Sequence, residues 1–196
     1  MGLTINYTLS VTRCSTFRAL KILLRRLQRQ AVKDGCAYVG KVLPSTRSDP
    51  DAPPFFDCAR GRKRRLHGGG PGTRGWLLEV WPGEGCETAV FGVLRQQKRI
   101  PPKKGQPDWP YCYSKRPVWK LSAWCKTYYA AEHGLEHFVR CHERVIHLLD
   151  LWRAGGGRLE IQDEGGFWEN RSQQALAAQI GDLESFRKLA RNRVFE

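Results

Sequence analysis

Four polar side chains in the C-terminal half of the sequence are the best candidates for catalysis: Lys126, His142, Asp163 and Glu164. Asp163 and Glu164 are adjacent and precede a Gly-Gly turn, a place where loops often present functional groups. Two adjacent carboxylates can coordinate a divalent cation or act as a general base, although such a pair more commonly accepts backbone hydrogen bonds in a turn. Lys126 ends a predicted strand, so it meets Glu164 at one edge of a sheet if the two strands are parallel neighbours.

The predicted helix over Gly134–Ala154 carries the histidine of this group. His142 lies within its apolar stripe, where a histidine is more often a hydrogen-bonded core residue than a catalyst. His133, His137 and Cys141 follow one another at intervals of four residues, a spacing that aligns potential zinc ligands on one helical face. The glutamate of the His-Glu-x-x-His motif is absent, and the reversed order matches too easily by chance to carry weight. We therefore predict no metal ligands by name, while a divalent metal at the acidic pair stays open.

The elements that must position these residues predict an α+β fold. Apolar and polar residues alternate strictly over Leu3–Val11, and two main helices are predicted over 16–33 and 134–154, followed by a C-terminal helix from about Ser172. Further strands are predicted over 36–43, 76–81, 86–94, 118–127 and 158–162. We expect a mixed or antiparallel sheet of about five or six strands with the two main helices packed on it. The order of elements resembles a ferredoxin-like plan with added strands.

Length and composition indicate one globular domain over residues 1–196, with 41% hydrophobic residues. No apolar run is long enough for a membrane helix, and the N-terminus does not have the pattern of a signal peptide. The seven cysteines are scattered without a Cys-x-x-Cys pair, which favours reduced thiols in the cytoplasm. We expect a thiol reagent to find seven free thiols in the unfolded protein when no reductant is added.

The net charge of +14 is concentrated in two segments. Residues 60–74 hold six basic residues and no acid, and residues 95–120 hold eight basic residues and one acid, which together supply 13 of the 14 charges. Prolines and glycines predict irregular, exposed segments over 44–74 and 95–117. Charge concentrated in this way suggests a polyanionic partner. The candidate binding residues are Arg62, Lys63, Arg64, Arg65, Lys98, Arg99, Lys103, Lys104, Trp109, Tyr111, Lys115 and Arg116.

Four short motifs are similar to a family of uncharacterised bacterial proteins. They are Trp81-Pro82-Gly83-Glu84-Gly85-Cys86-Glu87; Cys125-Lys126-Thr127 with Tyr129; Arg140-Cys141-His142 with Val145 and Leu148-Leu149-Asp150; and Asp163-Glu164-Gly165-Gly166 with Trp168-Glu169. The resemblance spans residues 76–94 and 119–180 and leaves out both basic segments. It implies a bacterial cytosolic protein, and it implies no catalytic residues because the family has no established activity.

Three functions stay open on the sequence alone. Basic residues interleaved with tryptophan and tyrosine favour binding of single-stranded nucleic acid, since cations neutralise phosphates while aromatic faces stack on bases. The alternatives are an enzyme with a site near Lys126, His142, Asp163 and Glu164, and a protein-interaction module. Strong salt dependence without turnover would indicate the first function, and a metal-dependent activity would indicate the second.

Overall fold

The computed structural model describes residues 3–11, 17–46, 55–57, 62–64, 74–100 and 112–181, with side chains described at 3–11, 17–44, 75–95 and 118–181. Its centre is an antiparallel sheet of seven strands in the order β2-β6-β7-β8-β1-β9, with β3 also paired to β6. The α+β prediction is confirmed, and the sheet is antiparallel in every pairing of the described strands.

The strands of this sheet are β1 (Thr4–Val11), β2 (Tyr38–Val39), β3 (Leu43–Thr46), β6 (Arg74–Trp81), β7 (Ala89–Ile100), β8 (Cys112–Lys126) and β9 (Arg158–Asp163). A separate hairpin pairs β4 (Phe55–Asp57) with β5 (Arg62–Arg64). The helices are α1 (Phe17–Lys33), the short 3-10 helix η1 (Tyr128–His133), α2 (Leu135–Ala154) and the single turn α3 (Phe167–Asn170), and residues 173–181 are also helical.

Six of these elements reproduce the ferredoxin-like plan. In chain order they are β1, α1, β7, β8, α2 and β9, and the four strands lie in the order β9-β1-β8-β7. Each helix thus connects two parallel strands that have another strand between them, which defines the split β-α-β unit. Strands β2, β3 and β6 are inserted between α1 and β7 and extend the sheet at that edge.

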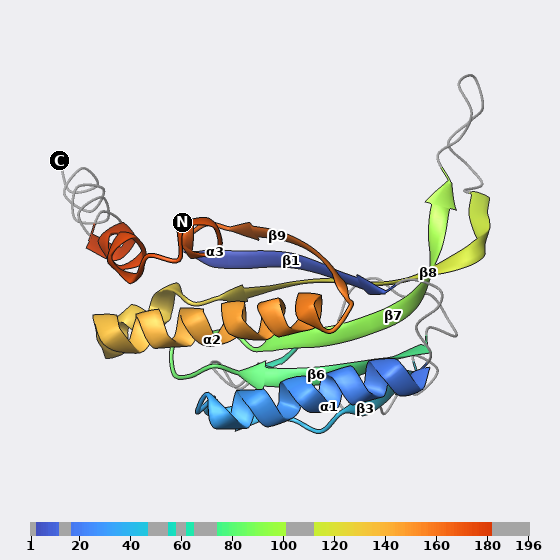
Figure 1. Ribbon diagram of the computed structural model, residues 1–196, viewed down its shortest axis with the longest axis horizontal. Coiled ribbons are helices and arrows are strands. Elements are labelled where there is room, and N and C mark those ends of the chain that lie inside the picture. The colour runs from blue at the N-terminus through green and yellow to red at the C-terminus, as the bar shows by residue number, and fades with distance from the viewer. Residues whose placement is uncertain are drawn as a thin grey trace, which may run out of the picture.

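The two long helices cover one face of the sheet (Figure 1). The alternation over β1 places Ile5, Tyr7 and Leu9 in the core, while the residues between them face the other way and are half-buried. Helix α1 buries its leucines against β6 and β7, and α2 buries a broad stripe that runs from Phe138 to Trp152. This burial confirms the expectation that the Gly134–Ala154 helix packs on the sheet.

Local signals at the helix ends behave as predicted. Helix α2 ends at Ala154, and the following Gly156 adopts a positive φ of 87°, which glycine tolerates without steric cost. Ser172 accepts a hydrogen bond from the Ala175 N–H through its side-chain oxygen (3.1 Å), so it caps the helix over 173–181 as expected.

The prediction that 44–74 and 95–117 are irregular throughout is wrong. Pro44 lies in β3, which pairs only with β6, and an edge strand tolerates a residue that lacks a backbone N–H. Strand β7 continues to Ile100 and β8 begins at Cys112, and their outer ends form a two-stranded arm that leaves the sheet (Figure 1). A register shift between Gln97 and Arg99 accompanies this departure, since a bulge bends the strand that contains it.

The strand expected over 36–43 is also shorter and broken. Only Tyr38–Val39 and Leu43–Thr46 are strands, and Gly40 lies between them, although its N–H still reaches the Glu79 carbonyl (2.9 Å). In the part of the chain that the structure describes, no helix is long and apolar enough to cross a membrane.

Candidate functional site

The four predicted catalytic residues all lie at one end of the sheet. Lys126 pairs with Thr4 at the end of β8, and Asp163 pairs with Ile5 at the end of β9. The two strands are parallel, as the prediction required, but they are not neighbours because β1 lies between them. The two strands therefore end at the same end of the sheet, as expected. The expectation that they are direct neighbours is wrong.

His142 and Asp163 are in contact and belong to a buried polar network. The His142 Nε2 atom lies 3.1 Å from Oδ1 and 3.2 Å from Oδ2 of Asp163, and its Nδ1 atom lies 2.9 Å from the Thr127 hydroxyl oxygen. All three residues are buried. Asp163 also accepts hydrogen bonds from the N–H groups of Gly165 and Trp168, both at 2.9 Å.

This network fixes the charge of the Asp163 carboxyl. Burial alone would raise the pKa of that group, but the hydrogen bond and charge of His142, followed by the N–H groups of Trp168 and Gly165, hold the pKa below its ordinary value. Because an ionised carboxylate is an acceptor only, the His142 Nε2 atom must carry its hydrogen toward Asp163.

The other two predicted residues make separate contacts. The Lys126 ammonium lies 5.8 Å from the centre of the Tyr129 ring, and a Glu164 carboxylate oxygen accepts the Thr4 N–H at 2.9 Å. Thr127, His142 and Asp163 have the order of a nucleophile, base and acid, but the hydroxyl is fully buried and cannot reach a substrate. This network anchors η1 and α2 to the end of β9. The described residues offer no group of three or more histidine, cysteine or acidic side chains able to hold a metal ion.

A second candidate site lies on the face of the sheet away from the helices. There β9, β1 and β8 form cross-strand rows in which Gln162, Asn6 and Trp124 are aligned, as are Glu160, Thr8 and Ser122 in the next row. A third row consists of Arg158, Ser10 and Lys120. Successive rows are about 7 Å apart, since residues two positions apart along a strand share a face.

The first two of these rows, with the residues that lie between them along the strands, line a shallow groove of about 370 Å³. Trp124 is half exposed, with 50% of its surface accessible, although it is a large aromatic residue. The Thr8 and Ser122 hydroxyls are 3.0 Å apart across the groove. Amide, hydroxyl and indole groups together provide hydrogen-bonding and stacking surfaces on one open sheet.

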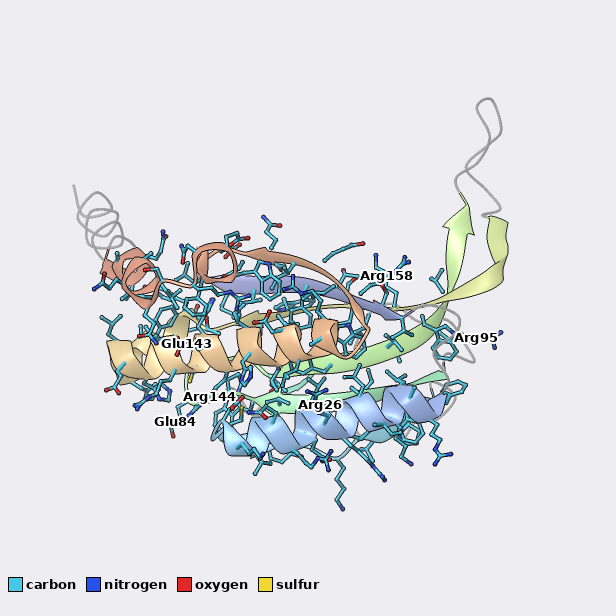
Figure 2. All side chains as sticks on the ribbon, viewed as in Figure 1. Arg26, Glu84, Arg95, Glu143, Arg144 and Arg158 are labelled. Atoms are coloured by element: carbon cyan, nitrogen blue, oxygen red, sulfur yellow. The ribbon has the colours of Figure 1, made fainter. Side chains whose placement is uncertain are left out.

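The groove is positively charged at the end nearest the arm. Arg158 and Lys120 belong to the row beside it. Arg95 lies where β7 leaves the sheet, opposite Trp119, which contacts Phe17 of α1 on the helix side of the sheet (Figure 2 labels Arg95 and Arg158). Lys98, Arg99, Lys115 and Arg116 lie further along the paired strands of the arm. The predicted cationic residues of this segment thus begin at the cationic row of the groove.

The structure distributes the remaining predicted binding residues over other parts of the chain. Arg62, Lys63 and Arg64 form strand β5, which pairs with β4 and not with the main sheet. Arg65, Lys103, Lys104, Trp109 and Tyr111 lie outside the described residues.

Sequence reasoning missed the groove itself. The polar halves of β1 and β8 were visible as the alternate residues Asn6, Thr8, Ser122 and Trp124, but an alternating strand gives no sign of which other strands lie beside it. The exposed tryptophan on an otherwise polar face was the signal that could have identified the site.

No protein-family model, curated protein or solved structure matches this chain. The fold and the two sites therefore provide the basis for assigning a function, and the resemblance to a bacterial family stays a prediction.

Proposed function

We propose that this protein binds single-stranded nucleic acid across the open face of β9, β1 and β8. The observation that carries the proposal is Trp124, which is half exposed in the polar groove that β8, β1 and β9 form on one side of the sheet. Single exposed apolar residues are common on protein surfaces, but the flat face of an indole among amide and hydroxyl groups is suited to stacking on a base.

The architecture supports the same partner. A ferredoxin-like sheet with helices on one face leaves the other face flat, and RNA-binding modules of this general plan stack bases on aromatic residues of their central strands. Trp124 is on β8, one of the two central strands of the ferredoxin-like unit, and Asn6 lies opposite it on the other. This is support by analogy of fold, and the side chains of the groove carry the chemical part of the proposal.

The polar groups of the groove suit base edges. Asn6 lies beside Trp124 in the cross-strand register and Gln162 lies beyond Asn6 in the same row, and each amide offers both a donor and an acceptor. A base stacked on Trp124 would place its edge toward these amides. The neighbouring row, with Ser122 and Thr8, offers hydroxyl groups to the next nucleotide.

The cations supply the affinity that does not depend on sequence. Arg158 and Lys120 lie at one end of the groove, and the strands of the arm beyond it hold Lys98, Arg99, Lys115 and Arg116. A strand stacked on Trp124 and running toward the arm would carry its phosphates past Arg158 and Lys120. The basic segment over 95–117 therefore acts in this proposal as an extension of the groove, whereas Arg62, Lys63 and Arg64 belong to a separate hairpin.

We place this activity in a reducing compartment such as the cytoplasm. Cys36, Cys86, Cys125 and Cys141 are all free thiols, as such a compartment would leave them.

The test is Trp124→Ala, assayed by fluorescence anisotropy with a labelled single-stranded oligonucleotide. Loss of one stacked base costs about 1–3 kcal/mol, which corresponds to an increase in Kd of about 5- to 150-fold. The matched control is Tyr38→Ala, because Tyr38 is 48% exposed and lies on β2 at the opposite edge of the sheet. Equal affinities of the two variants would contradict the proposal, as would binding of duplex in preference to single strands.

A further inference from the structure

Four cysteines that are distant in the sequence lie around the turn between β6 and β7, three of them buried and Cys36 half-buried. Cys36 follows α1, Cys86 is in the turn, Cys125 is near the end of β8 and Cys141 is on α2. The Cys86 N–H donates to the Gly83 carbonyl oxygen at 3.1 Å, and a Cβ atom placed at Gly83 would lie 2.6 Å from the Cys141 sulfur. The turn that carries Cys86 therefore lies directly against Cys141.

Cys141 is surrounded by hydrogen-bond donors. Its sulfur lies 3.5 Å from His137 Nε2 and 4.0 Å from Arg144 Nη1. Arg144 is held in place by the carbonyl oxygens of Asp34 and Pro82, both at 2.7 Å, and it extends from α2 toward the end of α1 (Figure 2). These fixed donors stabilise negative charge on the sulfur.

The protonation of His137 follows from a third contact. Its Nε2 atom lies 3.0 Å from the carbonyl oxygen of Glu84, which can only accept a hydrogen bond. Nε2 therefore carries a hydrogen and cannot take the proton of Cys141 as a general base would. This geometry does not fit a cysteine–histidine pair for acyl transfer, and it does fit a thiolate that reacts directly.

The other thiols of the cluster have a higher pKa than the Cys141 thiol. The hydrogen bond from Cys86, opposed by burial and assisted by His137 and Arg144, lowers the pKa of the Cys141 thiol to about 7. Burial raises the pKa of Cys36 to about 11 and also raises that of Cys125, while the hydrogen bond to Cys141 and burial raise the pKa of Cys86. Of the four thiols, Cys141 is therefore the one that ionises most readily near neutral pH.

We propose that Cys141 and Cys86 form a peroxide-responsive pair, in which Cys141 is oxidised by a hydroperoxide and Cys86 converts the product into a disulfide. The inference is independent of the proposed nucleic-acid binding. It rests on the close approach of the Gly83–Cys86 turn to the Cys141 sulfur and on the donors that surround that sulfur.

The chemistry balances with hydrogen peroxide as the oxidant. The Cys141 thiolate attacks one peroxide oxygen, the O–O bond breaks, and hydroxide leaves and takes a proton from solvent to become water. The sulfur loses two electrons to the peroxide and becomes a sulfenic acid. The Cys86 sulfur then attacks the Cys141 sulfur, the S–O bond breaks, and the hydroxyl group leaves with the Cys86 proton as a second water. Two thiols and one peroxide give one disulfide and two water molecules.

Access to the sulfur depends on Gly83. Cys141 is fully buried, and a Cβ atom at Gly83 would lie 2.6 Å from its sulfur and 3.0 Å from the Cε1 atom of His137. The missing side chain lets the turn lie directly over the thiolate. The proposal requires the turn to lift before peroxide can reach the sulfur, and the turn is held from α2 by the contacts of His137 with Glu84 and of Arg144 with Pro82.

Peptide mapping after treatment with stoichiometric hydrogen peroxide tests the pair. The full chain carries Cys14→Ser, Cys58→Ser and Cys112→Ser, so that the four clustered cysteines are the thiols that remain. The expected product is a Cys86–Cys141 disulfide. Cys86→Ser should stop the reaction at a sulfenic acid on Cys141, which dimedone traps, and Cys141→Ser should lower the rate of thiol loss at least tenfold. The matched controls Cys36→Ser and Cys125→Ser should still form the disulfide.

A second variant tests the same proposal without removing any thiol. In Gly83→Ala the added methyl group overlaps the Cys141 sulfur, so the turn must move away and oxidation should be several-fold faster. Gly181→Ala is the control, because a Cβ atom there meets open space. The proposal is overturned if Cys36 or Cys125 is oxidised first, if the disulfide joins another pair, or if Gly83→Ala reacts no faster than Gly181→Ala.

Discussion

At the scale of single residues, Asp163 has the most demanding role. Its carboxylate accepts hydrogen bonds from His142, Gly165 and Trp168, so its replacement leaves buried donors without acceptors. We expect Asp163→Asn to lower the free energy of unfolding by about 3–5 kcal/mol, the cost of breaking a buried charged pair. Urea denaturation at neutral pH measures this change.

The neighbouring carboxylate provides the control for that experiment. Glu164 accepts a single exposed N–H from Thr4, so Glu164→Gln should cost no more than about 1.5 kcal/mol. Equal losses in the two variants would mean that the Asp163 network contributes no more than a surface hydrogen bond.

The depressed pKa of Asp163 also predicts a dependence of stability on pH. A carboxyl group whose pKa is lower in the folded state stabilises that state above its unfolded pKa of about 3.9, and this contribution is lost as pH falls through the folded pKa. The stability of the wild type should therefore approach that of Asp163→Asn in acid. Denaturation of both proteins over a series of pH values between about 7 and 2 gives the difference directly.

The sequence indicated the kind of role these residues have but not their partners. Asp163 in a turn and His142 in an apolar stripe were each consistent with hydrogen-bonded structural residues. Their direct contact, and the inclusion of Thr127, depend on where η1 and β9 lie in three dimensions, and no local pattern encodes that arrangement. The cysteines illustrate the same limit, since their even spacing concealed a cluster.

At the scale of elements, α2 connects the sheet to the sites at its end. Leu148 is fully buried on the face of α2 that packs into the core. Leu148→Ala should lower the free energy of unfolding by about 2–5 kcal/mol, because the substitution removes buried methyl groups and leaves a cavity.

The same helix provides a control in Leu135, which is 48% exposed at its first turn. Leu135→Ala should change stability by no more than about 0.5 kcal/mol. Equal effects of the two substitutions in chemical denaturation would contradict the packing of α2 on the sheet.

Element boundaries were predictable where hydrophobic period and capping residues agreed. Gly134–Ala154 satisfied both conditions and Leu3–Val11 had a strict period of two, and the structure places α2 and β1 within a residue of each range. The segments rich in proline were misread because proline was taken to exclude strands altogether. Pro44 and Pro117 occur in strands, the first at an edge and the second where β8 pairs with β7 near the irregular register of the arm.

At the scale of the whole molecule, the surplus of positive charge predicts the salt dependence of nucleic-acid binding. Each phosphate neutralised on a single strand contributes about 0.7 to the slope of log K against log salt, so about four to six contacts give a slope of about −3 to −4. Replacing Lys98, Arg99, Lys115 and Arg116 with serine should flatten this slope, because these residues follow the cationic end of the groove. The same change at Arg62, Lys63, Arg64 and Arg65 tests the other basic segment.

Trp124→Ala should lower affinity in the same salt series with little change in slope, since stacking releases no counterions. A weak association that does not depend on salt, and that neither quadruple substitution alters, would favour a protein-interaction module. Filter binding across the salt series distinguishes these outcomes.

Composition pointed to a polyanion at this scale, but it could not reveal the topology that creates the groove. Strand β1 lies between β8 and β9, so Tyr7 has Ala123 on one side and Ile161 on the other. Pairings between residues so far apart in the sequence are set by the packing of both helices and by the register of the strands.

The central position of β1 has a consequence for the synthesis of the protein. The ribosome releases β1 more than a hundred residues before β8, and β9 emerges later still. During that interval a strand with an apolar face has two unpaired edges, and such strands readily join other chains. Translation speed and chaperone binding before β9 emerges should therefore determine how much newly made chain reaches the native state.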